Sequence, residues 1–178
     1  MAVAKKRKRF FDVEIPLINK DTQMQGYEIS ELEGKFLRYD LTRNLKGKNM
    51  VLVSKIKVEN EKAFAVPREL KLMSSFIRRM MRKGTNYVED SFSAECKDSR
   101  VRIKPFLITR RKVPRSIRRS LRNKAKEELT KHLKEKNSGE IFEELVSGQL
   151  QKSLGLMLKK TYPLSLCEIR EFKVEDKK

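Results

Sequence analysis

Alternation of apolar and polar residues predicts short strands along the first half of the chain. In the stretch 10–18, Phe11, Val13 and Ile15 fall on one side and acidic residues on the other, as in a half-buried strand. Pro16 is expected to end this strand or to mark it as an edge. Further strands are expected at 35–41, 50–58 and 62–66, with turn signals at 44–47 and 59–62, whereas the polar residues 19–26 are expected to form a loop.

In much of the second half of the chain, apolar residues recur every three or four positions, which is typical of helices. The first predicted helix spans residues 67–83, with Pro67 in its first turn, Gly84 after its end and Met80 in its apolar stripe. Residues 87–95 and 100–109 are expected to form a β-hairpin joined by residues 96–99, with Pro105 at an edge or a bulge. Further helices are expected at 115–136, 140–146 and 149–160, before a final strand at 164–174 that contains a bulge.

These elements together predict an α+β fold. Strands at such close spacing suggest an antiparallel sheet that curls into a small β-barrel-like core, and the helices are expected to flank it. The length of 178 residues is enough for one domain with a sizeable core. We therefore predict a single domain over residues 10–178.

Residues 100–126 are the most basic stretch of the chain, with twelve Lys or Arg and no Asp or Glu. After Pro114, apolar residues recur every four positions, so this part is a helix whose other faces are almost entirely basic. Like charges repel one another, and such a surface is expected to need a polyanion beside it. The residues predicted to bind nucleic acid here are Arg100, Arg102, Lys104, Arg110, Arg111, Lys112, Arg115, Arg118, Arg119, Arg122, Lys124 and Lys126.

A second basic block ends the first nine residues. Residues 1–9 are expected to form an arm that stays disordered until it meets an anion. Three interpretations remain open for this arm: an arm that runs along RNA, a nuclear-import signal, or a merely solvated tail. Its predicted RNA-binding residues are Lys5, Lys6, Arg7, Lys8 and Arg9.

Composition supports a partner rich in phosphate and argues against catalysis. The chain has 43 Lys or Arg against 24 Asp or Glu, a formal net charge of +19. His132 is the single histidine, and the two cysteines are too few for a zinc site made of thiols. The sequence also lacks a glycine-rich phosphate loop. We therefore predict that the protein is not an enzyme and has no cofactor and no metal.

Arginine outnumbers lysine in the stretch 100–126, and aromatic residues are few. Arginine suits bidentate contacts to phosphate, so backbone contact to a folded RNA is favoured over base stacking or a chosen DNA sequence. There is no run of 18 apolar residues, so no membrane partner is predicted, and a cytoplasmic location is expected.

Four stretches, taken in order, resemble the archaeal and eukaryotic "S-one-e" (also "S-three-a-e") family of small-subunit ribosomal proteins. They are residues 11–15, LEGKFLRYDLTRNL at 32–45, RVRIKPFLITRRK followed by RSIRRSLRNKAKEEL, and LVSGQLQKSLGLMLKKTYPLSLCEIREFKV at 145–174. The resemblance spans most of the chain and is nearest to the shorter, archaeal form.

The resemblance implies a structural ribosomal protein on the platform of the small subunit, near the messenger exit side. Expected partners are the 3′ region of the small-subunit ribosomal RNA and neighbouring platform proteins, and possible further ones are messenger RNA and initiation factors. The basic strand-to-helix region of the family matches Arg110–Lys112 and the arginines of the following helix. One alternative is a ribosome-associated RNA chaperone or translation factor. Another is an RNA-modifying enzyme, which the missing catalytic residues argue against.

Overall fold

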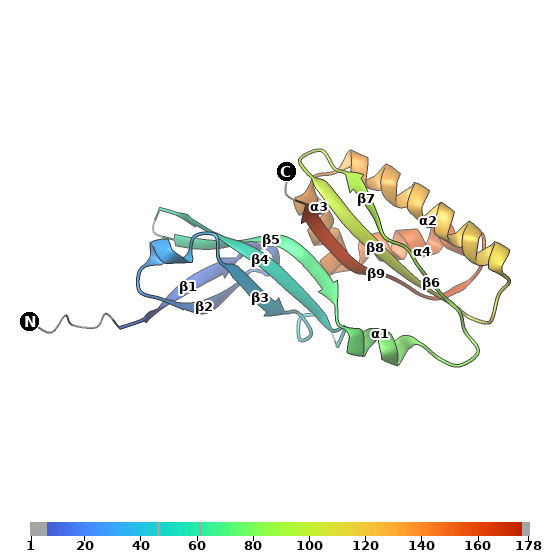
Figure 1. Ribbon diagram of the computed structural model, residues 1–178, viewed down its shortest axis with the longest axis horizontal. Coiled ribbons are helices and arrows are strands. Elements are labelled where there is room, and N and C mark those ends of the chain that lie inside the picture. Colours follow the sequence, from blue (N-terminus) through green and yellow to red (C-terminus); the bar gives the residue numbers. More distant parts are fainter. Residues whose placement is uncertain (1–6, 46, 61, 176–178) are drawn as a thin grey trace, which may run out of the picture. The chain divides into compact units, whose positions relative to one another are not determined.

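The computed structural model describes residues 7–45, 47–60 and 62–175, which form nine strands, four α-helices and two short 3-10 helices (Figure 1). These residues divide into two units. The first unit contains residues 7–39 and Leu52–Arg68, and the second contains Asp40–Val51 and residues 69–175. The α+β class predicted from the sequence is confirmed. That residues 10–178 fold as a single domain stays a prediction.

The strands predicted in the first half of the chain are present, and β1 ends at Pro16 as expected. Lys5 and Lys6 lie outside the described residues, and Arg9 is the first residue of β1. The elements are β1 (Arg9–Ile15), η1 (Pro16–Ile18), β2 (Lys20–Gly26), η2 (Ile29–Leu32), β3 (Phe36–Asp40), β4 (Met50–Glu59) and β5 (Lys62–Leu72).

The strands of the first unit form an open sheet, so the expected barrel is wrong. They pair in the order β2-β1-β5-β4-β3, and the outer strands β2 and β3 have no pairing with each other among the described residues. A barrel requires every strand to be paired on both sides. The sheet is also not purely antiparallel, because β1 and β5 run parallel, with Val13 beside Ala63.

The polar stretch predicted as a loop is instead strand β2. Asn19 adopts a left-handed conformation (φ 49°), which turns the chain sharply after η1 so that β2 runs back antiparallel along β1. Seven residue pairs join the two strands, from Ile15 and Lys20 to Arg9 and Gly26. Pairing with β1 therefore overrides the low strand propensity of the sequence KDTQMQG.

The helix predicted at 67–83 is wrong over its first half. Strand β5 continues to Leu72, and its residues 69–71 pair antiparallel with β9. Leu70 and Leu72 are buried at a spacing of two, which is the period of a strand. Helix α1 spans only Ser74–Met80; it buries Phe76 and Ile77, whereas Met80 is half-buried.

The β-hairpin predicted at 87–109 is present, but its first strand is interrupted. Strand β8 (Arg100–Thr109) pairs with β7 (Phe92–Glu95) and β6 (Tyr87–Glu89), and its other edge pairs with β9 (Leu164–Glu175). The gap between β6 and β7 lies opposite Pro105, which has no N–H group to donate to a partner strand. The register with β9 also shifts between Lys104 and Pro105, so the expected bulge is confirmed.

The three remaining helices match the sequence predictions to within two residues at each end. They are α2 (Arg115–Glu135), α3 (Ser138–Ser147) and α4 (Gln149–Lys159), and they pack against one another as a layer on the sheet of β6 to β9 (Figure 1). The rings of Phe142 and Phe172 meet edge to face, with centroids 4.9 Å apart, where α3 contacts β9. Phe172 also lies beside Leu70 on β5 and Ile103 on β8, so it is central to the core.

Substitution of Phe172 by alanine should destabilise the fold strongly. Phe172 is fully buried among well-packed neighbours, and we expect its loss to lower the free energy of unfolding by about 3–5 kcal/mol. Urea denaturation would measure this change. Met81→Ala is the control, because the Met81 side chain is 41% exposed and its loss should have little effect. Equal effects of the two substitutions would contradict this description of the core.

Candidate nucleic-acid interface

Helix α2 exposes its arginines because its apolar stripe is buried. Leu121, Ala125, Leu129 and Leu133 are at most 1% exposed, and the helix packs against β6, β7 and α4. The intervening positions in its first two turns therefore point away from this packed face. Of the four arginines there, Arg118 is half-buried and the other three are exposed, namely Arg115, Arg119 and Arg122.

These four arginines line one side of a groove with a cavity of about 740 Å³, and residues 85–89 line the other side. None of the four guanidinium groups forms an ion pair with another residue that the structure describes. Glu89 is the one carboxylate lining the groove in the described part, and Arg170 neutralises it through an ion pair. The groove therefore carries a strong positive charge, which we call the arginine groove.

A hydrogen-bond network fixes the two sides of the arginine groove to each other. The Thr109 hydroxyl accepts a hydrogen bond from the backbone N–H of Asn86 (3.0 Å) and donates one to the carbonyl oxygen of Arg111 (2.7 Å). The side-chain oxygen of Asn86 accepts a hydrogen bond from the backbone N–H of Val113 (2.9 Å). Thr109 is fully buried, so these bonds hold the loop before α2 against the start of β6. Asn86 and Thr109 carry no signal in the sequence, because their role depends on their meeting in space.

Tyr87 lies on the wall of the arginine groove opposite α2. Its ring stacks on buried Phe106, with centroids 6.1 Å apart and planes inclined by 27°, yet 57% of the residue is exposed. Across the groove, the Nε atom of Arg118 is buried and has no hydrogen-bond partner among the described residues. The groove thus combines arginines, a buried donor without a partner and an exposed aromatic ring.

The predicted RNA-binding residues on β8 have acidic protein partners, although Arg100 and Arg102 are also exposed. Arg100 and Arg102 lie 3.5 Å and 2.9 Å from carboxylate oxygens of Glu175, and the Lys104 amine lies 2.8 Å from Glu171. The stretch 100–126 itself contains no acidic residue, but β9 places two acidic residues beside the basic residues of β8. Two carboxylates thus offset part of the charge of these three residues, whereas the arginines of α2 have no carboxylate partner in the described structure.

The other predicted residues are spread over several places. Arg110, Arg111 and Lys112 are exposed in the loop between β8 and α2. Further along α2, the Lys124 amine donates a hydrogen bond to the Thr161 hydroxyl (2.9 Å), and Lys126 lies over the ring of Phe92, 5.6 Å from its centroid. In the first unit, Arg7, Lys8 and Arg9 are exposed where the described residues begin, and Lys8 lies over the ring of Tyr27.

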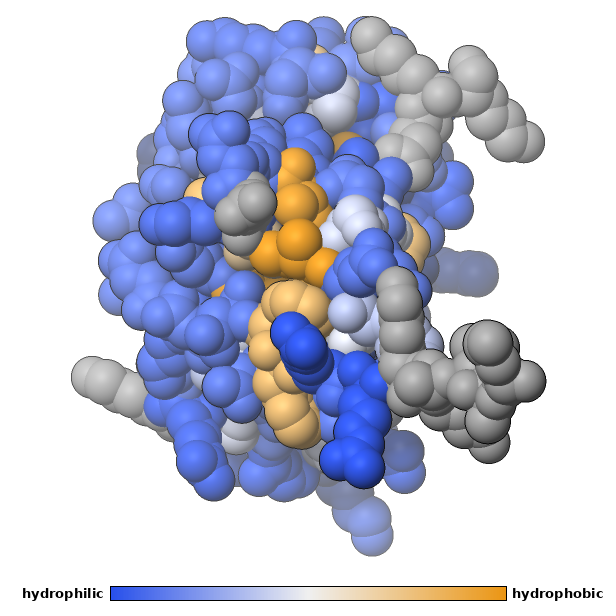
Figure 2. Space-filling model, turned by 90° about the vertical axis from the view of Figure 1, so that its left-hand side faces the viewer, coloured by the Kyte–Doolittle hydropathy of each residue, from blue (hydrophilic) through white to orange (hydrophobic). Residues whose placement is uncertain are grey.

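The surface of the first unit also exposes apolar side chains. Phe10 is 64% exposed and Phe36 is 61% exposed. Figure 2 shows a narrow hydrophobic strip on one face, surrounded by hydrophilic side chains. Apolar area of this kind does not attract phosphate, so the arginine groove is the better candidate for contact with nucleic acid.

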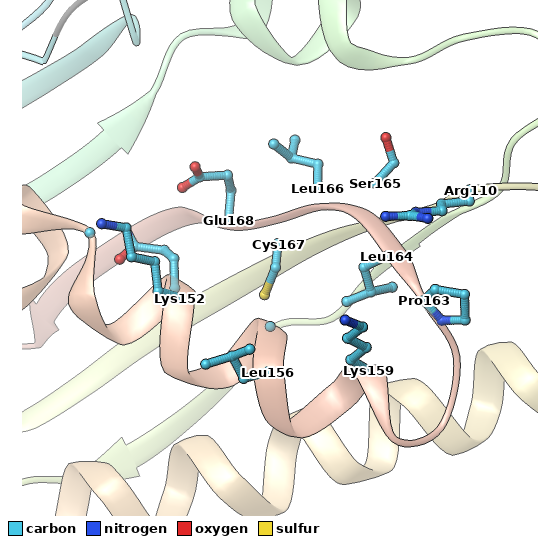
Figure 3. Close-up of a pocket in the computed structure, with 13 residues that line it drawn as sticks. Arg110, Lys152, Leu156, Lys159, Pro163, Leu164, Ser165, Leu166, Cys167 and Glu168 are labelled. Carbon is cyan, nitrogen blue, oxygen red and sulfur yellow. The ribbon is translucent and has the colours of Figure 1, made fainter.

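A second cavity, of about 570 Å³, lies between α4 and β9. Figure 3 shows Cys167 pointing from β9 toward α4, while Leu166 and Glu168 point to the opposite side of the strand. Burial, reinforced by the charge of Glu168, raises the pKa of Cys167 to about 12, so its thiol stays protonated and unreactive. Burial likewise raises the pKa of Cys96 to about 11. Neither thiol is suited to nucleophilic chemistry.

Other catalytic or metal-binding groups are not assembled in the described part of the chain. His132 lies 2.6 Å from Glu144, which also pairs with Lys136, so the histidine belongs to an ion-pair cluster between α2 and α3. No group of three His, Cys, Asp or Glu side chains there is placed to hold a metal ion. None of the described helices is long and apolar enough to cross a membrane.

Comparison with known proteins decides the family. A model of the ribosomal S3Ae family matches residues 4–178. The chain belongs to the ribosomal S3Ae family. The family inferred from four sequence stretches is thereby confirmed, and with it an archaeal-type structural protein of the small ribosomal subunit rather than an enzyme.

Relatives of this S3Ae protein come from several archaea. It is 27% identical over 178 residues to small ribosomal subunit protein eS1 of Nanoarchaeum equitans, a match that covers 96% of this chain and 90% of the relative. It is 32% identical over 138 residues to the protein of the same name from Pyrobaculum aerophilum, covering 76% of this chain and 62% of the relative. Over 102 residues, it is 30% identical to that of Methanothermobacter thermautotrophicus, covering 57% and 52% of the two chains.

The ion pair between Lys104 and Glu171 should stabilise the fold in a pH-dependent way. Burial acts to raise the pKa of Glu171, but the hydrogen bond and charge of Lys104 outweigh it and hold the pKa below its ordinary value. A carboxylate with a lowered pKa stabilises the folded state above about pH 5, and this contribution is lost as the pH falls through the folded-state pKa. Glu171→Gln should therefore lower the free energy of unfolding at pH 7 by on the order of 1 kcal/mol.

Urea denaturation of the wild type and the Glu171→Gln variant from pH 7 to pH 3 would measure this effect. The difference between the two proteins should shrink as the pH falls from about 5 through the lowered pKa of Glu171, because the wild-type carboxylate becomes protonated there. Glu143→Gln is the matched control, because Glu143 is exposed on α3 and has no ion pair with a described residue. A difference that stays constant with pH would exclude the ion pair as its cause.

Proposed function

We propose that this S3Ae protein binds the small-subunit ribosomal RNA through the arginine groove and the adjoining loop of Arg110–Lys112. The observation that carries the proposal is the row of four arginines on α2 that have no carboxylate partner in the described structure. The basic residues of β8 differ, because Glu171 and Glu175 neutralise them. Unbalanced positive charge next to an open groove favours a phosphate backbone as the partner.

The beginning of α2 strengthens this attraction. The helix starts at Arg115 and has no acidic residue in its first turn, so its free backbone N–H groups and its dipole add positive potential at the same end as the arginines. Arginine also forms paired hydrogen bonds to phosphate oxygens, which lysine does not. The first half of α2 is thus suited to phosphate contact, whereas its second half carries Glu127, Glu128 and Glu135 among the lysines.

The family resemblance supports a more specific location. We propose that the protein lies on the platform of the small subunit near the messenger exit side, in the cytoplasm. Its partners there would be the 3′ region of the ribosomal RNA and neighbouring platform proteins, with messenger RNA and initiation factors close by. The exposed residues Arg7, Lys8 and Arg9 would add RNA contacts at the first unit. For Arg100, Arg102 and Lys104 we propose a structural role instead.

Loss of two exposed arginines should weaken RNA binding and reduce its salt dependence. For Arg119→Ala combined with Arg122→Ala, we expect the affinity for small-subunit ribosomal RNA to fall roughly tenfold or more. We also expect the slope of log K against log salt to decrease by about 1.4 to 1.8, since each phosphate contact contributes roughly 0.7 to 0.9. Filter binding over a range of salt concentrations would measure both quantities.

The matched control is Lys131→Ala combined with Lys134→Ala. These lysines are exposed on the same helix with the same spacing, so the control removes equal charge from the half with mixed charge. An equal loss of affinity in both variants would mean that RNA binding depends only on net charge, and the arginine groove would not be the binding surface.

Sedimentation of native small subunits at raised salt separates a ribosomal constituent, which stays in the subunit peak, from an RNA chaperone or translation factor, which is released.

A further inference from the structure

We infer that the arginine groove takes up an unpaired nucleotide, with its base stacked on Tyr87 and its phosphates held by the arginines of α2. This inference rests on the proposed function and adds a local preference for single-stranded RNA. Contacts with the arginines of α2 alone would suit the phosphate backbone of any nucleic acid, paired or unpaired. Tyr87 is the feature that distinguishes a base from a bare backbone.

The position of Tyr87 is suited to stacking. The residue pairs with Ile108 across the strands and its ring is supported by Phe106, which is 2% exposed. The ring is therefore held in place before any ligand arrives, while 57% of the residue is exposed and the residue lines the groove. Every RNA base has a flat face that can stack on such a ring, whereas a paired base in a helix hides that face.

The groove also has the dimensions and the polar groups that a nucleotide needs. Its cavity of about 740 Å³ lies within the range of roughly 300–1,000 Å³ for small-ligand sites. The buried Nε of Arg118 lacks a partner in the described structure, and a buried donor without a partner is costly. For this Nε to donate to a phosphate oxygen in the groove, the Arg118 side chain would have to turn toward the groove. Glu89 does not oppose the phosphate, because Arg170 pairs with it.

The groove is also rigid on the side that carries Tyr87. Asn86 precedes Tyr87 and is tied by its backbone and its side chain to Thr109 and Val113. A fixed aromatic ring loses little conformational entropy on binding. The arrangement therefore favours a preformed nucleotide site over a surface that orders only around RNA.

Two RNA probes can test the inference on the full chain. The first is a labelled oligouridylate of about ten nucleotides, and the second is an RNA duplex of about ten base pairs. Fluorescence anisotropy would give the affinity of each probe for the wild type, Tyr87→Ala, Tyr87→Phe and the variant that lacks Arg119 and Arg122. Phe36→Ala is the matched control, since Phe36 is also an exposed aromatic residue (61%) but lies outside the groove.

We expect Tyr87→Ala to lower the affinity for the oligouridylate on the order of tenfold and to leave the duplex affinity nearly unchanged. Tyr87→Phe and Phe36→Ala should behave like the wild type. Circular dichroism melting would show whether each variant is folded. If Tyr87→Ala is unfolded, Tyr87→Leu takes its place, because leucine keeps apolar contact with Phe106 but has no flat face on which a base can stack.

Each other outcome overturns a distinct claim. If Tyr87→Ala binds both probes as the wild type does while the arginine variant loses both, the proposed function stands and the nucleotide site is wrong. If Tyr87→Ala lowers the affinity for both probes equally, Tyr87 maintains the shape of the groove and does not stack on an unpaired base. If the arginine variant also binds both probes normally and instead loses a polyglutamate peptide, the groove belongs to an acidic protein partner.

Discussion

Burial of the apolar stripe of α2 is the constraint that organises the basic surface. Leu121, Ala125, Leu129 and Leu133 can be removed from water only if the helix lies flat on the sheet and on α4. The remaining positions of its first two turns then lie outside this packed face; four of them are arginines, and three of these arginines are exposed. The positive groove is thus a consequence of packing, and it tolerates the repulsion among its arginines only if an anion or solvent screens them.

Strand β9 supplies the opposite charge on the other side of β8. Glu171 and Glu175 come from a segment more than sixty residues further along the chain, yet the antiparallel register places them beside Lys104, Arg100 and Arg102. The same ladder carries Phe172 into the core between Ile103 and Leu70. One strand therefore completes the hydrophobic core and neutralises part of the basic stretch, which leaves α2 and its preceding loop as the unbalanced region.

Local signals in the sequence predicted most elements of the second unit. The period of four after Pro114 predicts α2, and the loss of phase in 164–174 predicts the bulge opposite Pro105. Residues 19–26 and 67–72 were predicted wrongly because their strand conformation depends on pairing with β1 and β9, which no local pattern reveals. The open sheet instead of a barrel was missed for the same reason, since closure depends on whether distant edges meet.

The candidate site was predictable in part. The clustering of arginine in 115–122 identified α2 as a candidate RNA-binding helix, but nothing in the sequence distinguished among the twelve basic residues of 100–126. Only the pairing of β8 with β9 distinguishes the basic residues of β8, which have carboxylate partners, from the arginines of α2, which have none in the described structure. Tyr87, Asn86 and Thr109 carried no signal, because a single tyrosine or a polar pair acquires meaning only when the fold places it against α2.

We propose that RNA lies against α2 and β6 rather than against β8. Ultraviolet cross-linking of native small subunits, followed by mass spectrometry of the RNA-bound peptides, would show which of these elements touches RNA. The structure predicts RNA adducts on peptides from residues 85–89 and 110–122. RNA adducts on β8, with those peptides free of RNA or cross-linked only to protein, would contradict it.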